Sequence, residues 1–145
     1  MDRTVPSARP LASPLHAILL AFPVALYPSA LLSDIAYYNT AEIQWANFSS
    51  WLLVGANFFS GLVLAWAILS LFLGRARYAK GRGILYLALI AATFIAGVVN
   101  SFQHARDGWH SVGTLGLVLS AVCTLLILGA AFIAHRSGHL VEART

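Results

Sequence analysis

The chain has 145 residues, of which 59% are hydrophobic and only 10% are charged. A soluble domain carries about 25% charged residues, so this composition indicates one integral membrane domain over 1–145 and excludes a soluble nucleotide-binding fold. The net charge is only +4 and is unevenly spread, which favours a topology signal over nucleic-acid binding. The single cysteine, Cys123, excludes a disulfide framework and a thiolate metal site.

The first predicted span follows a polar tail at 1–13 and runs from Leu15 to about Tyr38. Such a segment is long enough for a bilayer core, which takes roughly 20 apolar residues. His16 and Asp34 lie five helical turns apart, so both point the same way, and Tyr27 falls near the same line. An aspartate at the centre of a membrane helix costs about 2.5–3.5 kcal/mol, and less near the ends. The segment therefore predicts a polar stripe that faces protein or a ligand and not lipid.

Three further apolar segments predict the remaining spans, at about 44–73, 84–104 and 110–135, followed by a polar tail at 136–145. Asn57 sits near the middle of the second span, where an unpaired amide is costly, so we expect it to face the bundle and bond another helix. The fold class predicted is all-α, an integral membrane antiparallel four-helix transmembrane bundle.

The third and fourth spans each carry a distinctive face. One face of the third span combines small and polar residues at steps of four, three and four: Thr93, Gly97, Asn100 and His104. The fourth span has a small-residue face of the kind that lets membrane helices approach closely, formed by Gly113, Gly116 and Ser120.

The basic residues predict the orientation of the bundle. With four spans, both tails and the second loop share one side, and the other side holds only Arg106. Basic residues are enriched in cytoplasmic loops, so we expect both termini in the cytoplasm and the protein in a bacterial inner membrane. The eight residues on the cytoplasmic side are Arg3, Arg9, Arg75, Arg77, Lys80, Arg82, Arg136 and Arg144.

This topology gathers polar residues near the outer face, with His16 and His135 near the inner face. The outer cluster is Asp34, Asn100, His104, Arg106, Asp107 and His110. It could hold a haem or a metal, relay protons, or bind a small solute. Alternatively, Asp34 or Asp107 pairs with Arg106, and the histidines reach the headgroup region. The cofactor-binding candidates are His16, Asp34, Asn100, His104 and His110; the sequence names no metal ligand and no catalytic residue.

Several motifs resemble an uncharacterised bacterial family of small four-helix inner-membrane proteins, catalogued as a domain of unknown function. In the first span, His16 is followed after five residues by Phe22-Pro23, and Asp34 closes the segment. The run Asn100-Ser101-Phe102-Gln103-His104-Ala105-Arg106-Asp107-Gly108-Trp109 and the run Leu115-Gly116-Leu117-Val118-Leu119-Ser120-Ala121 are also similar to the family.

The resemblance covers about the whole membrane portion and implies a fold and a location, but no settled activity. The chain departs from the family pattern at Ala17, where relatives often have proline, and at Ala21. The polar motif positions of the family map here to His16, Asp34, Asn100, His104 and Asp107.

Three functional hypotheses remain open, and the sequence favours the first two, with the third as the alternative. The first is electron transfer, with a b-type haem or a quinone as the possible cofactor. His104 and His110 flank a tight turn, however, so they cannot easily coordinate one iron from opposite faces of a haem. The second is an accessory or anchor subunit that packs against other membrane subunits or its own copies. The third is a small-solute or proton conductor along His16, Tyr27 and Asp34. The chain carries no phosphate loop, no Cys-x-x-Cys-His, no HExxH and no nucleophile elbow, so we expect no enzyme acting alone.

Overall fold

The computed structural model describes residues 13–73, 81–106 and 112–135, and these contain four long helices. They are α1 (Pro14–Thr40), α2 (Ile43–Phe72), α4 (Gly81–His104) and α5 (Thr114–His135). All four are long and apolar enough to cross a bilayer. The predicted all-α four-helix membrane bundle is confirmed, whereas the side of the membrane that holds the termini stays a prediction.

The helix bounds lie close to the predicted spans, and the main difference is at the start of the fourth. The sequence predicts a start at His110, which lies outside the described residues, while α5 begins at Thr114. The first helix begins one residue before the predicted span, at Pro14. Proline suits this position because the first turn of a helix does not use its backbone N–H groups, and Ser13 caps the turn through the backbone N–H of His16.

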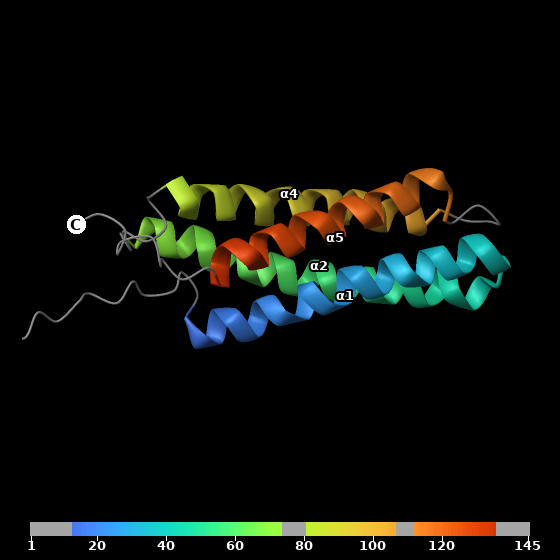
Figure 1. Cartoon of the computed structure of the whole chain (residues 1–145), viewed down its shortest axis with the longest axis horizontal. Helices are drawn as coiled ribbons and strands as arrows, with labels where there is room; N and C mark the ends of the chain where they lie inside the picture. The colour runs from blue at the N-terminus through green and yellow to red at the C-terminus, as the bar shows by residue number, and fades with distance from the viewer. Residues whose placement is uncertain (1–12, 74–80, 107–111, 136–145) are drawn as a thin grey trace, which may run out of the picture.

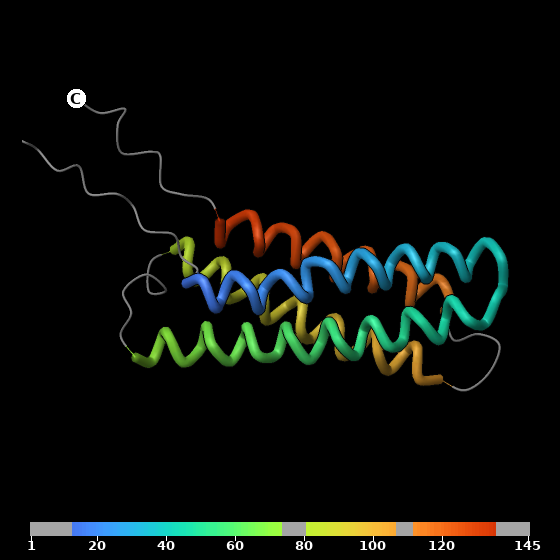
Figure 2. Tube along the Cα trace, turned by 90° about the horizontal axis from the view of Figure 1, so that it is seen from below, coloured from blue at the N-terminus to red at the C-terminus, as the bar shows by residue number. Residues whose placement is uncertain are grey.

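Successive helices run in opposite directions along the bundle (Figure 1). Each helix packs against two others: α1 and α4 both contact α2 and α5, so α1 faces α4 across the interior. The view in Figure 2 shows the same arrangement turned by a quarter. We call the end where α1 begins and α5 ends the tail end, and the end where α1 leads into α2 the turn end. The turn between α1 and α2 is closed by Ala41 in the left-handed conformation, with a φ of 55°.

The interior combines fully buried aliphatic side chains with small residues. The aliphatic residues are Leu20, Leu53, Val63, Ile90 and Ile127, and the small ones include Ala30, Ala56, Ala67 and Ala130. Small residues let helix backbones approach closely, which is how membrane helices gain packing energy without a hydrophobic driving force between them. Large apolar residues such as Trp51, Phe58 and Leu125 are exposed on the outside, where a bilayer solvates them.

Candidate functional site

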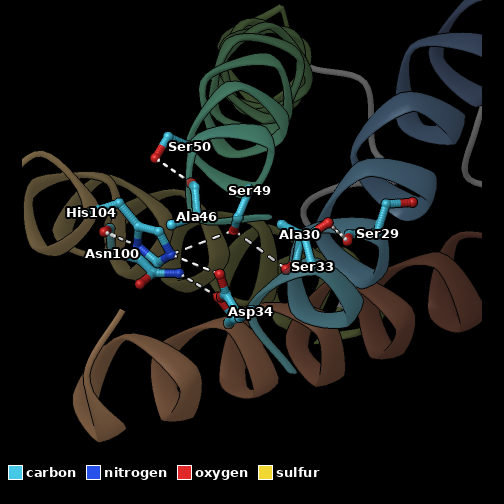
Figure 3. Close-up of polar contacts among 10 residues, drawn as sticks. Ser29, Ala30, Ser33, Asp34, Ala46, Ser49, Ser50, Asn100 and His104 are labelled. Atoms are coloured by element: carbon cyan, nitrogen blue, oxygen red, sulfur yellow. Dashed lines mark hydrogen bonds and ion pairs between the residues drawn. The ribbon is translucent and has the colours of Figure 1, made fainter. Parts of the chain in front are cut away.

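A buried cluster of polar side chains joins all four helices near the turn end. Asp34 of α1 faces His104, the last residue of α4, with Asp34 Oδ1 and His104 Nε2 2.9 Å apart (Figure 3). Ser120 of α5 donates a hydrogen bond to Asp34 Oδ2. Ser49 of α2 lies 3.4 Å from His104 Nε2 and donates to the carbonyl oxygen of Ala30, one turn before Asp34. Asp34 is completely buried, so its carboxyl group has no contact with solvent or lipid.

The partners of the cluster determine where most of its hydrogens are. His104 Nδ1 lies 3.0 Å from the backbone oxygen of Asn100, which can only accept, so Nδ1 carries a hydrogen. Ser120 Oγ accepts from Asn100 Nδ2 at 2.7 Å, and its own hydrogen points to Asp34 Oδ2. Ser49 uses its hydrogen on Ala30. One hydrogen remains, and it lies between His104 Nε2 and Asp34 Oδ1.

That hydrogen gives the pair two arrangements of equal net charge. On His104 Nε2 it makes an imidazolium beside a carboxylate, and on Asp34 Oδ1 it makes a neutral imidazole beside a carboxylic acid. The pair is neutral overall in either case, which suits an apolar interior where an isolated charge is costly. The bond connects residues 70 positions apart in the sequence, so it also ties α1 to α4 across the bundle.

One acceptor in the cluster has no donor. Asn100 is fully buried, and its amide nitrogen is used by Ser120, but Asn100 Oδ1 has no hydrogen-bond partner. The side-chain amide lies beside the imidazole of His104 (Figure 3). Exchanging the amide oxygen and nitrogen would leave the nitrogen without an acceptor and Ser120 without its donor, so the cluster lacks one partner in either orientation.

A second polar cluster lies further from the turn end, around Tyr27 and Asn57. The hydroxyl of Tyr27 donates to Asn57 Oδ1 at 2.8 Å and lies 3.2 Å from Ser60 Oγ. Asn57 Nδ2 donates to the backbone oxygen of Gly97 at 3.1 Å and to Ser101 Oγ at 2.7 Å. These bonds link α1, α2 and α4, and they agree with the expectation that Asn57 faces the bundle and bonds another helix.

A third cluster lies near the tail end and consists of His16 and Tyr86. His16 Nε2 and the hydroxyl oxygen of Tyr86 are 2.5 Å apart, and the two rings meet edge to face with centroids 5.6 Å apart. Both side chains are almost fully buried, and His16 Nδ1 has no hydrogen-bond partner. His135, the other histidine predicted near this end, is exposed, and its Nδ1 donates to the carbonyl oxygen of Ala131 in its own helix.

The structure therefore brings three of the predicted site residues together, namely Asp34, Asn100 and His104. His16 lies on the same face of α1 as Asp34, as the periodicity predicts, but belongs to a separate cluster 18 residues away. His110 and Asp107 lie outside the described residues. Asp34 pairs with His104, while Arg106 is exposed just beyond the end of α4.

The sequence did not identify Ser49 as a member of the site, and it assigned Ser120 to a helix-packing face. Both are fully buried and bond to the central pair or beside it. Gly116 also faces inward, because a Cβ atom there would lie 3.4 Å from His104 Cε1. The available signal was that Gly116 and Ser120 are one turn apart on α5, but that spacing does not distinguish a face inside this bundle from one that docks a partner.

Within the described parts of the chain, no three histidine, cysteine, aspartate or glutamate side chains converge to form a metal site. Both nitrogens of His104 already have hydrogen-bond partners, so iron could bind there only if one of these bonds were broken. The cluster can hold and exchange a proton as it stands, and it offers one vacant acceptor at Asn100 Oδ1.

Residues 12–138 match the family described as Predicted membrane protein (DUF2231). No curated protein and no solved structure matches the chain. The family match extends over all four helices and includes each of the three polar clusters. The chain therefore belongs to the DUF2231 family of multi-pass membrane proteins, whose function is unknown.

Proposed function

We propose that this protein transfers protons in the membrane, and that Asp34 and His104 bind and release the transferred proton. The observation that carries the proposal is the contact of 2.9 Å between His104 Nε2 and Asp34 Oδ1, together with the other hydrogen bonds of the cluster. Every other polar hydrogen of Asp34, His104, Ser49 and Ser120 is directed to a defined acceptor, while the hydrogen between His104 Nε2 and Asp34 Oδ1 has an acceptor at each end.

The chemistry of the pair supports both uptake and release. A second proton can be accommodated when the imidazolium and the carboxylic acid form together, and loss of the shared proton leaves a carboxylate that Ser120 still stabilises by a hydrogen bond. Ionisable side chains inside membrane helices are costly and commonly mark proton or ion pathways. A purely structural link between helices needs no group that titrates, as the hydrogen bonds of Asn57 illustrate.

Proton transfer can be tested in proteoliposomes that contain a pH-sensitive dye and carry a potassium gradient with valinomycin. We expect Asp34→Asn to lower the protein-dependent proton flux by about tenfold or more, because the amide cannot exchange the shared proton. The matched control is His135→Gln, since His135 is exposed and bonds only within its own helix among the contacts described. A flux that is equal in the wild type, Asp34→Asn and empty vesicles would refute the proposal.

A second candidate function is electron transfer with a b-type haem, and one atom favours it. His16 Nδ1 is a buried imidazole nitrogen without a partner, so it could ligate iron without losing a hydrogen bond. The visible spectrum of protein expressed with a haem supply tests this candidate, and the absence of a Soret band would exclude it. A quinone-linked role has no comparable support among the described contacts.

The accessory-subunit hypothesis is compatible with proton transfer, because a small proton-carrying protein can belong to a larger membrane complex or to a homo-oligomer. A small-residue face on the fourth span could dock another subunit, but Gly116 and Ser120 of that face pack inside the bundle. We also propose one membrane domain with cytoplasmic tails in a bacterial inner membrane, supported by the excess of basic residues on the tail side.

A further inference from the structure

The tail end of the bundle holds a second pair of side chains that can exchange protons. His16 is the third residue of α1, and Tyr86 is the sixth residue of α4. They meet across the interior with 2.5 Å between His16 Nε2 and the Tyr86 hydroxyl oxygen. Asp34 and His104 lie on the same two helices, α1 and α4, but near the C-terminal end of each helix, at the turn end of the bundle. The same pair of helices therefore carries one histidine-centred contact near each face of the bundle.

The unpartnered nitrogen of His16 indicates that this pair is incomplete in isolation. If Nε2 accepts from Tyr86, Nδ1 carries a hydrogen with no acceptor; if Nε2 donates to Tyr86, Nδ1 carries a lone pair with no donor. A buried polar atom without a partner is unfavourable in either tautomer. His16 lies in the first turn of α1, at the tail end of the bundle, where we expect the membrane domain to meet water, and a water molecule can act as either donor or acceptor.

The two pairs are separated by distance and by apolar packing. His16 and Asp34 are 18 residues apart on one continuous helix, or about 27 Å at the usual helical rise. The interior between His16 and the Tyr27 cluster contains fully buried apolar residues: Leu20 on α1, Val63 on α2, Ile90 on α4 and Ala130 on α5. The one hydroxyl on that part of α4, Thr93, bonds to the carbonyl oxygen of Leu89 in its own helix.

We propose that His16 and Tyr86 form a second proton-exchange site, and that buried His16 Nδ1 exchanges its proton with water that enters from the tail end of the bundle. A hydronium ion gives its proton to the Nδ1 lone pair, which leaves water and an imidazolium whose Nε2–H donates to Tyr86. The reverse step returns the proton to water, and no other bond forms or breaks. This site and the Asp34–His104 site then serve opposite faces, with the aliphatic layer between them.

Within the described helices, few other ionisable groups lie at this end of the bundle. The α2 helix contains no ionisable side chain, and α1 contributes only His16 in its first three turns. The α4 helix contributes Arg82 and Tyr86 near its start, and α5 contributes His135 at its end. His135 lies at the same end of the bundle as His16, so the signals of the two histidine rings must be assigned separately in any test of the site.

The test is nuclear magnetic resonance of the full chain with isotope-labelled histidine rings, reconstituted in vesicles with one orientation. His16→Gln assigns the His16 signals, and His135→Gln assigns those of the nearby exposed ring. The pH is then changed on one side at a time with impermeant buffers. We expect the His16 signals to move when the tail-side pH changes and to stay constant when only the other side changes. Tyr86→Phe keeps the ring and removes the hydroxyl, so the His16 titration midpoint should move by about half a pH unit or more.

Two outcomes overturn the inference: His16 signals that ignore the tail-side pH, or His16 signals that follow the opposite side equally well. If His16→Gln fails to fold, single His→Gln variants at the other four positions, 104, 110, 135 and 139, assign their signals, and the remaining histidine signals belong to His16. The inference extends the proposed function to a second face, but the two fail separately. Loss of flux in Asp34→Asn with a silent His16 supports the proposed function and refutes the second site. If the His16 signals follow the tail-side pH but the wild type shows no proton flux, the second site is supported and the proposed function is refuted.

Discussion

A single methyl group added at Gly97 should disturb the interior of the bundle strongly. A Cβ atom at Gly97 would lie within 3.0 Å of both Asn57 Oδ1 and the Tyr27 hydroxyl oxygen, and 3.1 Å from Tyr27 Cε1. Real Cβ atoms do not approach other atoms so closely, so Gly97→Ala must displace Tyr27, Asn57 or α4 itself. The bonds at risk are Tyr27 to Asn57, Asn57 to the Gly97 carbonyl and Asn57 to Ser101.

The expected loss of stability follows from these contacts. Overpacking a well-packed interior costs about 1–3 kcal/mol. Interhelical hydrogen bonds in membrane proteins contribute about 0.6 kcal/mol each, so the three bonds add about 2 kcal/mol. The better helix propensity of alanine offsets at most about 1 kcal/mol. The net expectation for Gly97→Ala is a loss of about 3 kcal/mol in the free energy of unfolding.

A matched control is Gly129→Ala, because a Cβ atom there would lie 3.9 Å from Leu89 Cδ1, which is an ordinary contact. Reversible unfolding of both variants in bicelles, measured by steric trapping or by denaturant titration, gives the difference directly. Adding Tyr27→Phe to Gly97→Ala removes one of the two clashing oxygen atoms and should recover part of the loss. If Gly97→Ala is as stable as Gly129→Ala, the close packing around Tyr27 and Asn57 described above is incorrect.

Two further predictions concern the Asp34–His104 cluster. Asp34→Leu and His104→Leu should each lower the free energy of unfolding by about 3–5 kcal/mol, because each leaves a buried partner uncompensated. In a double-mutant cycle, the double variant should lose less than the sum of the two single losses. Additive losses would show that the pair is not coupled. Ser120→Ala should cost about 1–3 kcal/mol, since it leaves the Asn100 amide and one oxygen of Asp34 without their partner. The control Ser50→Ala removes only a hydrogen bond to a carbonyl oxygen of the same helix, so its free energy of unfolding should lie within about 0.5 kcal/mol of the wild type in the same assay. Equal losses for the two serine variants would contradict the role of Ser120.

The spans and the polar stripe of α1 could be predicted from the sequence because both depend on local geometry. Four apolar segments of sufficient length leave few alternatives to four membrane helices. His16, Tyr27 and Asp34 are fixed on one face by the helical repeat alone, and all three are buried in the structure. Asn100 and His104, one turn apart, were likewise expected on one face of the third span.

The pairing between helices could not be predicted in the same way. Asp34 bonds to His104 because α1 and α4 face each other across the bundle at that depth, and both facts depend on how the helices pack. A shift of α4 by one residue would rotate His104 by about 100° away from Asp34. The sequence offered Arg106 as an ion-pair partner for Asp34 or Asp107, whereas in the structure Asp34 pairs with His104 and Arg106 lies beyond the end of α4.

In a membrane protein, the sequence alone does not indicate which serine residues face the interior of the bundle. In a soluble helix the polar face points outward, whereas here apolar residues cover both the interior and the lipid-facing surface, so hydrophobic periodicity gives no direction. Ionisable and amide side chains indicate the interior, because lipid cannot solvate them. A serine can satisfy its hydroxyl on its own helix, as Ser29 does with the Ala25 carbonyl, and so it carries no such constraint. Ser49 and Ser120 therefore became recognisable as parts of the site only once the four helices were placed around Asp34 and His104.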